Sequence, residues 1–510
     1  MSIPGIPGLG QINAQPTPST TSTTRTITLD PGSEWRFVTA KATSSSSTNF
    51  LTNPSSTSSS SSGVKVKLLS GSAERDGTSL ALNKVYTFSR TKSKIFTWEG
   101  CSLEVTGSCV NESVYRPATM EDSCMVGWVN LHMLILQEQR ERVSQSLKNH
   151  HHHHHGHHKR SDGAGAGGSG PPGPRVMICG APNTGKTTMA RTLAGYATRQ
   201  GGQPLVASLD PREGLLSLPG TISAAVFGTL MDIEDPRGGF GVRNTPSSGP
   251  SMVPVKLPVV YYFGREKVVD DVPLWKDLTR KLASSVRAKL KEVDEVRASG
   301  VILDMPGWEG RPDAVGLEVM ECAVREFAIN TIVVLDNWEL EQELHNKFLQ
   351  EKTPFGEAIS VLRLDKSNGA VPRDPAWSKT EMEAAIKEYF FGDAKQTLSP
   401  MTLSVSYDEL GIFRALDESE SYDPEDSSQQ VLEPAEISSE LRYWTLAIID
   451  ASVNDPPETI RLAPVLGFIA IADVDEDRRR LKFLSPVMEQ LGNRPLIWGK
   501  WPEPYLNLLG

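Results

Sequence analysis

A phosphate-binding loop between an apolar strand and a helix constrains this chain more than any other feature. Residues 180–187 read Gly-Ala-Pro-Asn-Thr-Gly-Lys-Thr, which matches the P-loop pattern G-x-x-x-x-G-K-T. The apolar run Val176–Cys179 precedes the loop, and helical periodicity follows it as far as Arg199, where Gly201 and Gly202 predict the helix end. This order of strand, loop and helix predicts an α/β domain that binds a nucleotide.

Each residue type in the loop suits a phosphate ligand. Gly180 and Gly185 let the backbone turn so that successive N–H groups face a phosphate, and the helix adds its positive amino end. Lys186 is expected to reach the β- and γ-phosphates, and the Thr187 hydroxyl to ligate Mg²⁺. We therefore expect a purine nucleoside triphosphate to bind. The loop alone leaves open whether the chain hydrolyses it, transfers its phosphate or only holds it.

The chain has 510 residues, which is enough for roughly three domains. Shifts in composition divide it into five segments. Residues 1–25 are rich in Ser, Thr, Pro and Gly, which predicts disorder. Residues 26–126 alternate short strands with turns and predict a small all-β domain. Residues 127–173 predict a helix, over 127–148, followed by a linker rich in His and Gly. Residues 174–395 predict the P-loop domain, and residues 396–510 a third domain that is mostly β with some helix.

The expected fold class is therefore α/β, with a central P-loop domain between a small N-terminal β domain and a mostly β C-terminal domain. Strands of the central domain are apolar on both faces, which indicates a parallel sheet covered by helices. The predicted strands are Val176–Cys179, Leu205–Leu209, Val301–Leu303, Thr331–Leu335 and Ile359–Leu362. Long helices are predicted over Leu278–Arg297 and Lys379–Tyr389.

Charge, cysteine content and hydropathy argue against several classes of function. The 52 Lys and Arg against 62 Asp and Glu give a net charge of −10, which argues against coating nucleic acid by bulk charge. An RNA contact would need a local groove. The five scattered cysteines suggest a reducing compartment and no zinc site, and no apolar run is long enough to predict a membrane span. The histidine run from His150 to His158 indicates a low-complexity loop, although it could bind metal.

Two aspartates follow predicted strands of the central domain. Asp210 follows Leu205–Leu209, and Asp304 follows Val301–Leu303. Ligands of open parallel sheets bind beyond the carboxyl ends of the strands, so both side chains could face the P-loop. One could join the Mg²⁺ shell while the other orients or deprotonates a nucleophile. Each could instead only cap a turn.

Two further residues lie on loops beside this edge. Asp304-Met-Pro-Gly307 has the D-x-x-G form in which a glycine N–H can approach a γ-phosphate. Trp308 follows, and it could stack on a base or belong to the core. Arg373, in a polar loop, could close over phosphate as a charge clamp or lie free on the surface. A guanine-reading N-K-x-D motif is lacking, which disfavours a GTPase.

With these pieces in place, the chain resembles the eukaryotic polynucleotide 5′-hydroxyl kinase family, in particular the Clp subunits of the mRNA cleavage and polyadenylation factor. The resemblance covers nearly all of the chain outside the Ser-, His- and Gly-rich insertions. Besides the P-loop it rests on Phe-Thr-Trp-Glu-Gly-Cys at 96–101, Leu-Pro-Gly-Thr at 218–221, Asp-Met-Pro-Gly-Trp at 304–308, Val-Val-Leu-Asp at 333–336, Glu-Tyr-Phe-Phe-Gly at 388–392 and Gly-Phe-Ile-Ala at 467–470.

The resemblance implies a location, partners and residue roles. It implies ATP with Mg²⁺, a nuclear location, and assembly with other subunits of the factor, including the one that contacts the tail of RNA polymerase II. Asp210 matches the base of the family, Trp308 the clamp on the nucleic-acid end, and Arg373 a lid arginine. The positions that match nucleotide contacts are Glu34, Lys92, Asn183, Thr184, Gly185, Lys186, Thr187 and Thr188.

The chain departs from the family where active kinases carry D-x-G-Q. Here the run is Asp210-Pro-Arg-Glu213, so the glycine and the glutamine are lost, and a second lid arginine is replaced by Ser378. Arginine in place of glycine blocks a close backbone approach, and glutamate adds negative charge near the phosphates. Losing transition-state charge donors costs ~10³-fold or more in rate, while ground-state binding survives. We therefore expect an ATP-binding scaffold for pre-mRNA 3′-end formation; the alternative is an active ATP-dependent polyribonucleotide 5′-hydroxyl kinase.

Overall fold

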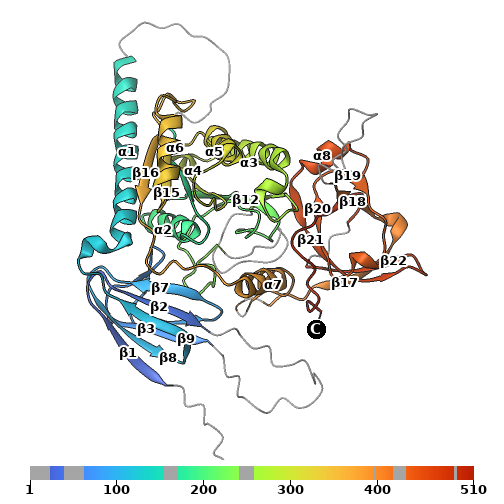
Figure 1. The fold of residues 1–510 in the computed structure, drawn as a ribbon, viewed down its shortest axis with the longest axis horizontal. Helices are drawn as coiled ribbons and strands as arrows, with labels where there is room; N and C mark the ends of the chain where they lie inside the picture. The colour runs from blue at the N-terminus through green and yellow to red at the C-terminus, as the bar shows by residue number, and fades with distance from the viewer. Residues whose placement is uncertain are drawn as a thin grey trace, which may run out of the picture.

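The computed structural model describes residues 23–39, 63–153, 171–240, 258–393, 395, 397–416, 432–486 and 491–509. The disorder expected for residues 1–25 falls outside these ranges up to residue 22, and its predicted end is wrong because strand β1 (Thr24–Leu29) already begins at Thr24. Most of the predicted His- and Gly-rich linker also lies outside these ranges. Three β-rich bodies follow one another along the chain, with the P-loop body in the middle (Figure 1). Among the described residues, no helix is both long enough and apolar enough to cross a membrane.

The N-terminal body is a sandwich of two antiparallel sheets. Its sheets have the strand orders β1-β8-β3-β6 and β5-β4-β7-β2-β9. Inward side chains such as Trp35 and Phe37, two residues apart on one face, stack with their ring centroids 4.3 Å apart. The strands are β1 (Thr24–Leu29), β2 (Glu34–Thr39), β3 (Val64–Gly71), β4 (Glu74–Arg75), β5 (Thr78–Ser79), β6 (Val85–Phe88), β7 (Lys92–Phe96), β8 (Cys101–Thr106) and β9 (Cys109–Tyr115).

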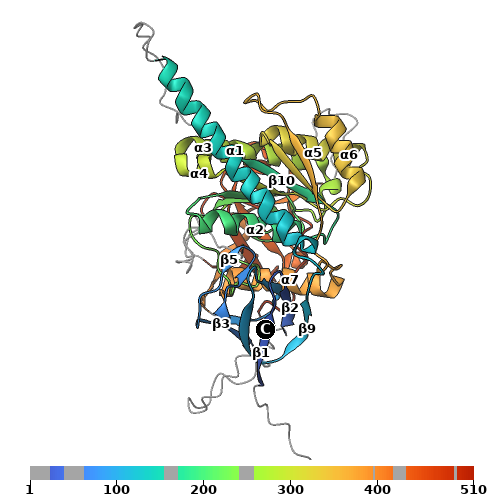
Figure 2. The same ribbon diagram turned by 90° about the vertical axis from the view of Figure 1, so that its left-hand side faces the viewer.

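A long helix, α1 (Cys124–His153), leaves the sandwich and runs along the central body (Figure 2). Its early turns bury Met125, Trp128 and Leu131 against the central core. The helix contains the predicted segment 127–148 but continues into the histidine run, which was expected to be loop. Neither glycine nor proline interrupts the sequence there before Gly156, so nothing in it forces an earlier end.

The central body is a seven-stranded sheet with the order β13-β12-β11-β14-β10-β15-β16. Its strands are β10 (Arg175–Gly180), β11 (Leu205–Ser208), β12 (Thr221–Val226), β13 (Val259–Tyr262), β14 (Val301–Asp304), β15 (Thr331–Leu335) and β16 (Ser360–Leu364). The five predicted strands run parallel, as expected. Two unpredicted strands, β12 and β13, extend the sheet antiparallel beyond β11. Antiparallel edge strands are common on otherwise parallel sheets.

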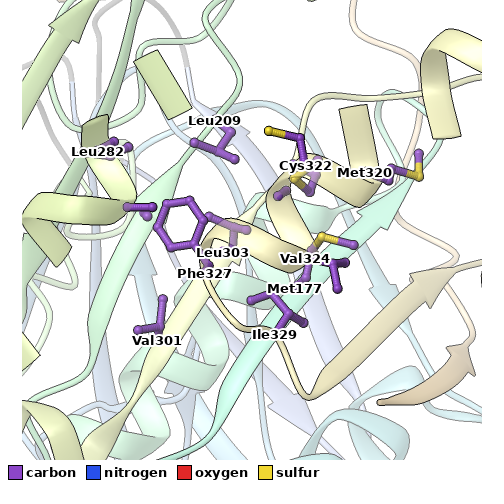
Figure 3. Close-up of a cluster of buried hydrophobic side chains, with 14 of the residues drawn as sticks. Met177, Leu209, Leu282, Val301, Leu303, Met320, Cys322, Val324, Phe327 and Ile329 are labelled. Carbon is purple, nitrogen blue, oxygen red and sulfur yellow. The ribbon is translucent and has the colours of Figure 1, made fainter. Parts of the chain in front are cut away.

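Helices cover both faces of this sheet. The helices of this body are α2 (Lys186–Arg199), α3 (Val272–Glu292), α4 (Asp294–Ser299), α5 (Ala314–Glu326) and α6 (Trp338–Phe348). The next helix, α7 (Pro375–Phe391), packs instead in a core with residues of the C-terminal sheet. One core lies between the sheet and α3, α5 and α6 (Figure 3), and the other lies under α1 and α2. The single helix predicted over Leu278–Arg297 is wrong: Val293 is extended, with φ −125° and ψ 110°, and separates α3 from α4.

The C-terminal body is a second seven-stranded sheet, with the order β17-β22-β21-β20-β23-β18-β19. Buried Arg461 joins it to the central body by donating to the carbonyls of Tyr262, at 2.7 Å, and Phe263, at 2.8 Å. Its elements are β17 (Met401–Ser406), β18 (Gly411–Ala415), β19 (Leu432–Pro434), β20 (Thr445–Ile449), α8 (Pro457–Arg461), β21 (Val465–Asp475), β22 (Arg480–Ser485) and β23 (Pro495–Trp498). Short 3₁₀ turns lie at Met120–Asp122, Val268–Asp270, Tyr407–Glu409 and Ser439–Leu441.

One segment of the central body, residues 231–240, crosses to the N-terminal sandwich; we call it the strap. Ile233 of the strap lies in the core of the sandwich, and Phe240 lies in the core beneath α2. The guanidinium of Arg75, 2% exposed, donates to three strap carbonyls, those of Ile233, Asp235 and Pro236. The strap therefore joins the central body to the N-terminal sandwich through both apolar packing and the hydrogen bonds of buried Arg75.

Candidate nucleotide site

The P-loop backbone has the conformations that a phosphate cradle needs. Its φ angles are +146° at Gly180, +61° at Asn183 and +94° at Gly185, which favour glycine or asparagine. A Cβ built at Gly180 would lie 2.8 Å from the carbonyl oxygen of Leu335, whereas one at Gly185 would meet nothing within 4 Å. Gly180 is therefore needed for space, and the loop beside Gly185 is open to a ligand.

Helix α2 begins at Lys186 with no side chain capping its amino end. First-turn amides have no partner within a helix, so they and the helix dipole favour an anion here. The Lys186 ammonium group donates to the carbonyl of Ala181 at 2.9 Å, and the Thr184 hydroxyl donates to the same oxygen at 2.8 Å. Lys186 is only 8% exposed. A phosphate would take the place of this carbonyl as the partner of the buried ammonium.

The two predicted metal ligands lie together. The Thr187 hydroxyl donates to Oδ2 of Asp304 at 2.7 Å, and Oδ1 of Asp304 is buried with no hydrogen-bond partner. Burial raises the pKa of Asp304 to about 6, against the opposing effects of Lys186 and Thr187. A buried carboxylate oxygen without a partner beside a hydroxyl suits a hard cation such as Mg²⁺.

No group of three or more His, Cys, Asp or Glu that could hold a metal occurs within the described ranges. The protein ligands present at the P-loop are therefore few. Mg²⁺ accepts such a site because it usually keeps waters and takes its other ligands from nucleotide phosphates. The residues present thus fit a nucleotide-bound Mg²⁺.

The Asp210 loop brings an additional acidic group to the site. Oδ1 of Asp210 accepts from the amide of Arg212 at 3.0 Å. Burial and the negative charge of Glu213 raise the pKa of Asp210 to about 7. Glu213 itself pairs with Arg373, with 2.5 Å between Oε1 and Nη1. Burial acts to raise the pKa of Glu213, but Arg373 and Lys186 outweigh it and lower the pKa. The predicted lid arginine is thus at the site and is held by a carboxylate.

Gly307 and Trp308 pack tightly beside the P-loop. The Trp308 amide donates to the carbonyl of Gly180 at 3.0 Å, and a Cβ on Gly307 would lie 2.8 Å from the Pro182 backbone. The Trp308 ring covers Gly316 of α5 so closely that a Cβ there would lie 2.5 Å from it. The half-buried ring also packs against the central core. Trp308 therefore makes the core contact that was one of its two expected roles, and it lies beside the P-loop; its stacking on a base stays a prediction.

The N-terminal sandwich contributes a charged cluster. Glu34 is 2% exposed and pairs with Lys94 at 2.7 Å and Arg36 at 2.6 Å. Burial acts to raise the pKa of Glu34, but Lys94 and Arg36 outweigh it and lower the pKa. Lys92 is exposed, and its pKa is lowered by burial of part of the side chain and by the charge of Arg373.

Glu34 and Lys92, the two sandwich residues that the resemblance matches to nucleotide contacts, have different charged neighbours. Glu34 pairs with Arg36 and Lys94, whereas Lys92 lies near Arg373. Sequence reasoning missed Arg36 and Lys94. Their signal was present in the strand pattern, because Arg36 and Lys94 share the side-chain face of Glu34 and Lys92 at a spacing of two, and they are direct register partners.

Comparison with known families gives a consistent result along the chain. A model described as the N-terminal beta-sandwich domain of polyadenylation factor matches residues 28–143. A model described as mRNA cleavage and polyadenylation factor CLP1 P-loop matches residues 180–392, and one described as pre-mRNA cleavage complex II protein Clp1 matches residues 398–503. The central match confirms the nucleotide-binding P-loop domain.

Relatives match over their whole length. The chain is 53% identical to the mRNA cleavage and polyadenylation factor CLP1 of Chaetomium globosum, over 99% of this chain and 100% of that protein. It is also 53% identical to the protein of that name from Neurospora crassa, over 99% of both. A solved structure of wild-type Clp1p in complex with Pcf11p has the same fold, with a TM-score of 0.74 and 24% identity over 94% of this chain and 98% of that one. These matches show that the chain belongs to the Clp1 family of mRNA cleavage and polyadenylation factors.

Proposed function

We propose that this chain is a scaffold subunit of the nuclear mRNA cleavage and polyadenylation factor and holds ATP with Mg²⁺ without turning it over. Its full-length relatives carry the name of that factor. One solved Clp1p structure of the same fold is described in terms of its Pcf11p interface and of ATP loss in a point mutant. ATP, Mg²⁺ and a partner of the Pcf11 kind are therefore the ligands we assign.

The observation that carries the proposal is the pairing of Glu213 with Arg373 at 2.5 Å. Phosphoryl transfer depends on cations that balance charge as it develops on the moving phosphoryl group. Here the lid arginine is already matched by a carboxylate of the same loop as Asp210. This pairing lowers the positive charge available to a transition state but leaves the P-loop free to bind ATP.

The other residues of the site would bind the nucleotide and its cation rather than take part in phosphoryl transfer. Lys186 would neutralise the β- and γ-phosphates, while Thr187 and Asp304 would hold the cation. Mg²⁺ would supply charge neutralisation between the phosphates. Burial and the charge of Glu213 raise the pKa of Asp210 to about 7, so near neutral pH the free carboxylate that a base needs is less available than in an ordinary aspartate.

Bound ATP would stabilise the scaffold by mass action. A ligand that binds only the folded state at 100 times its Kd adds about 2.7 kcal/mol. Because the P-loop helix and the charged cluster of Glu34 belong to different bodies, a nucleotide in contact with both would favour one arrangement of the chain. A partner could then recognise that arrangement.

An active polyribonucleotide 5′-hydroxyl kinase is the second candidate. It is favoured by the presence of Lys186, Asp304 and Asp210 together at the carboxyl edge of the sheet. In that case Asp210 would take the proton of the RNA hydroxyl, and Trp308 would contact the terminal base.

Two measurements separate the candidates. Purified protein is extracted with acid and the nucleotide identified; intact ATP supports the scaffold, while ADP or no nucleotide contradicts it. The protein is then incubated with γ-labelled ATP, Mg²⁺ and a 5′-hydroxyl RNA oligonucleotide. We expect no transfer above that of Lys186→Ala. Labelled RNA that depends on Lys186 would establish the kinase and refute the scaffold.

A further inference from the structure

The loop that carries Arg373 is tied to the N-terminal sandwich. This lid loop, residues 365–374, connects β16 to α7. Residues 367–370 form a tight turn within it, closed by the amide of Ala370, which donates to the carbonyl of Ser367 at 2.8 Å. We call this the lid turn. The Asn368 amide group donates to the hydroxyl of Tyr115, at the end of β9, at 2.9 Å.

A second contact lies beside the first. The guanidinium of Arg36 lies over the Tyr115 ring, 4.3 Å from its centroid, and also pairs with buried Glu34. A Cβ built on Gly369 would lie 2.8 Å from Nε of Arg36. The lid turn therefore lies directly on a surface made by Arg36 and Tyr115, and glycine at 369 allows the close approach. We call Arg36 and Tyr115 the lid seat.

We propose that the lid seat positions Arg373 over the triphosphate site, so that Arg36 and Tyr115 are positioning residues for the γ-phosphate end of the nucleotide. This inference rests on the proposed function, because it takes ATP as the ligand. It adds a role for the sandwich beyond contact with the nucleotide through Glu34 and Lys92.

The physical basis is the length of free chain on each side of Arg373. With the turn seated, only residues 371–374 separate it from the start of α7. Without the seat, residues 365–374 form one longer loop between β16 and α7. The entropy of placing a side chain from a flexible loop scales as (3/2)RT ln n, so this difference is a factor of about four in affinity. An unseated Arg373 should therefore contact the γ-phosphate less often.

Asn368→Ala is the first test, because it removes one seat contact and touches neither Glu34 nor the P-loop. Asn346→Ala, at an exposed position near the far end of α6, is the matched control. Calorimetric titration with Mg-ATP and Mg-ADP should show ATP affinity lowered about threefold to fourfold by Asn368→Ala. ADP affinity should be unchanged, because ADP lacks the phosphate that Arg373 reaches. The control should alter neither affinity.

A double-mutant cycle separates positioning from general damage. If Asn368 acts through Arg373, the pair Asn368→Ala/Arg373→Ala should bind ATP no more weakly than Arg373→Ala alone. Additive losses, or equal losses of ATP and ADP affinity in Asn368→Ala, would overturn the inference. Gly369→Ala, which pushes on Arg36, should reproduce the selective loss of ATP affinity.

A readout without nucleotide keeps this inference separate from the proposed function. In nucleotide-free protein, trypsin should cut after Lys366 and Arg373 at least threefold faster in Asn368→Ala than in wild type or the control. Unchanged cutting would refute the seat even if ATP binds. Faster cutting in a protein that binds no ATP would keep the seat as an anchor of the lid loop but would refute both the proposed function and the positioning of Arg373 for ATP.

Discussion

Replacing Glu213 by glutamine should change nucleotide binding and fold stability in opposite directions. Glu213 holds Arg373 at 2.5 Å and lies near Lys186, whose charge helps to lower its pKa. A triphosphate must compete with this carboxylate for both cations. The Glu213→Gln variant keeps the shape of the side chain and removes its charge. Nucleotide-free protein should lose the ion pair, while ATP should meet two cations without a competitor.

The magnitudes follow from exposure and distance. The side chains of Arg373 and Glu213 are 45% and 35% exposed, so their pair contributes at most about 1 kcal/mol to folding. A unit charge about 8 Å from a phosphate charge at an effective dielectric constant of about 20 costs roughly 2 kcal/mol. Screening at physiological salt leaves about half of that. We therefore expect ATP to bind about fivefold tighter, a gain of about 1 kcal/mol.

Calorimetry with Mg-ATP and Mg-ADP measures the gain in nucleotide affinity. Urea unfolding of nucleotide-free protein measures the loss in the free energy of unfolding. Glu266→Gln is the control, because Glu266 forms a pair of similar exposure with Arg212 at 3.2 Å and does not involve the lid arginine. ATP affinity should rise more than ADP affinity in Glu213→Gln only. Unchanged or weaker ATP binding in Glu213→Gln would refute the competition that we infer from the Glu213–Arg373 pair.

Three further perturbations test the fold and the site. Arg75→Leu should lower the free energy of unfolding by about 3 kcal/mol in urea titration, because one buried and two part-buried strap carbonyls lose their donor; a loss below about 1 kcal/mol would contradict this. The pKa values of Asp304 and Asp210 are raised to about 6 and about 7, so their stabilising contribution is complete below about pH 4 and is lost as pH rises through those values. The melting temperature of nucleotide-free protein should therefore fall between about pH 4 and 7, and an equal fall in Asp304→Asn would argue against this origin. Gly307→Ala should displace Pro182 and weaken ATP binding at least about tenfold with unchanged circular dichroism; wild-type affinity would disprove the tight packing seen there.

Much of the fold could be predicted from the sequence because its elements have clear local signals. β15 has the predicted bounds Thr331–Leu335, since a fully buried parallel strand is a continuous apolar run. β9 has only a weak signal in the sequence, because Val110, Asn111, Glu112 and Ser113 are exposed and show no apolar alternation. β12 was missed because its Ser and Ala residues carry a weak strand signal, and it is buried through its place in the sheet.

Site residues could be predicted where their role follows from a local sequence pattern. They could not be predicted where the role depends on contact between residues far apart in the sequence. Thr187 and Asp304 were both identified, because a P-loop and a strand end each have a local pattern. The pairing of Glu213 with Arg373 joins residues of two loops, and the seating of Gly369 on Arg36 joins two bodies. No spacing or periodicity within one segment encodes such contacts, so they became visible only in the structure.

The strap has a consequence for how the protein is made. The N-terminal sandwich is synthesised first, but Ile233, part of its core, leaves the ribosome more than a hundred residues after Tyr115. At about 5–20 residues per second, this delay is on the order of 10 s. During that time the nascent sandwich exposes the apolar gap that Ile233 later fills, and buried Arg75 lacks its carbonyl partners. A ribosome-bound chaperone therefore has a defined window and a defined target on this polypeptide.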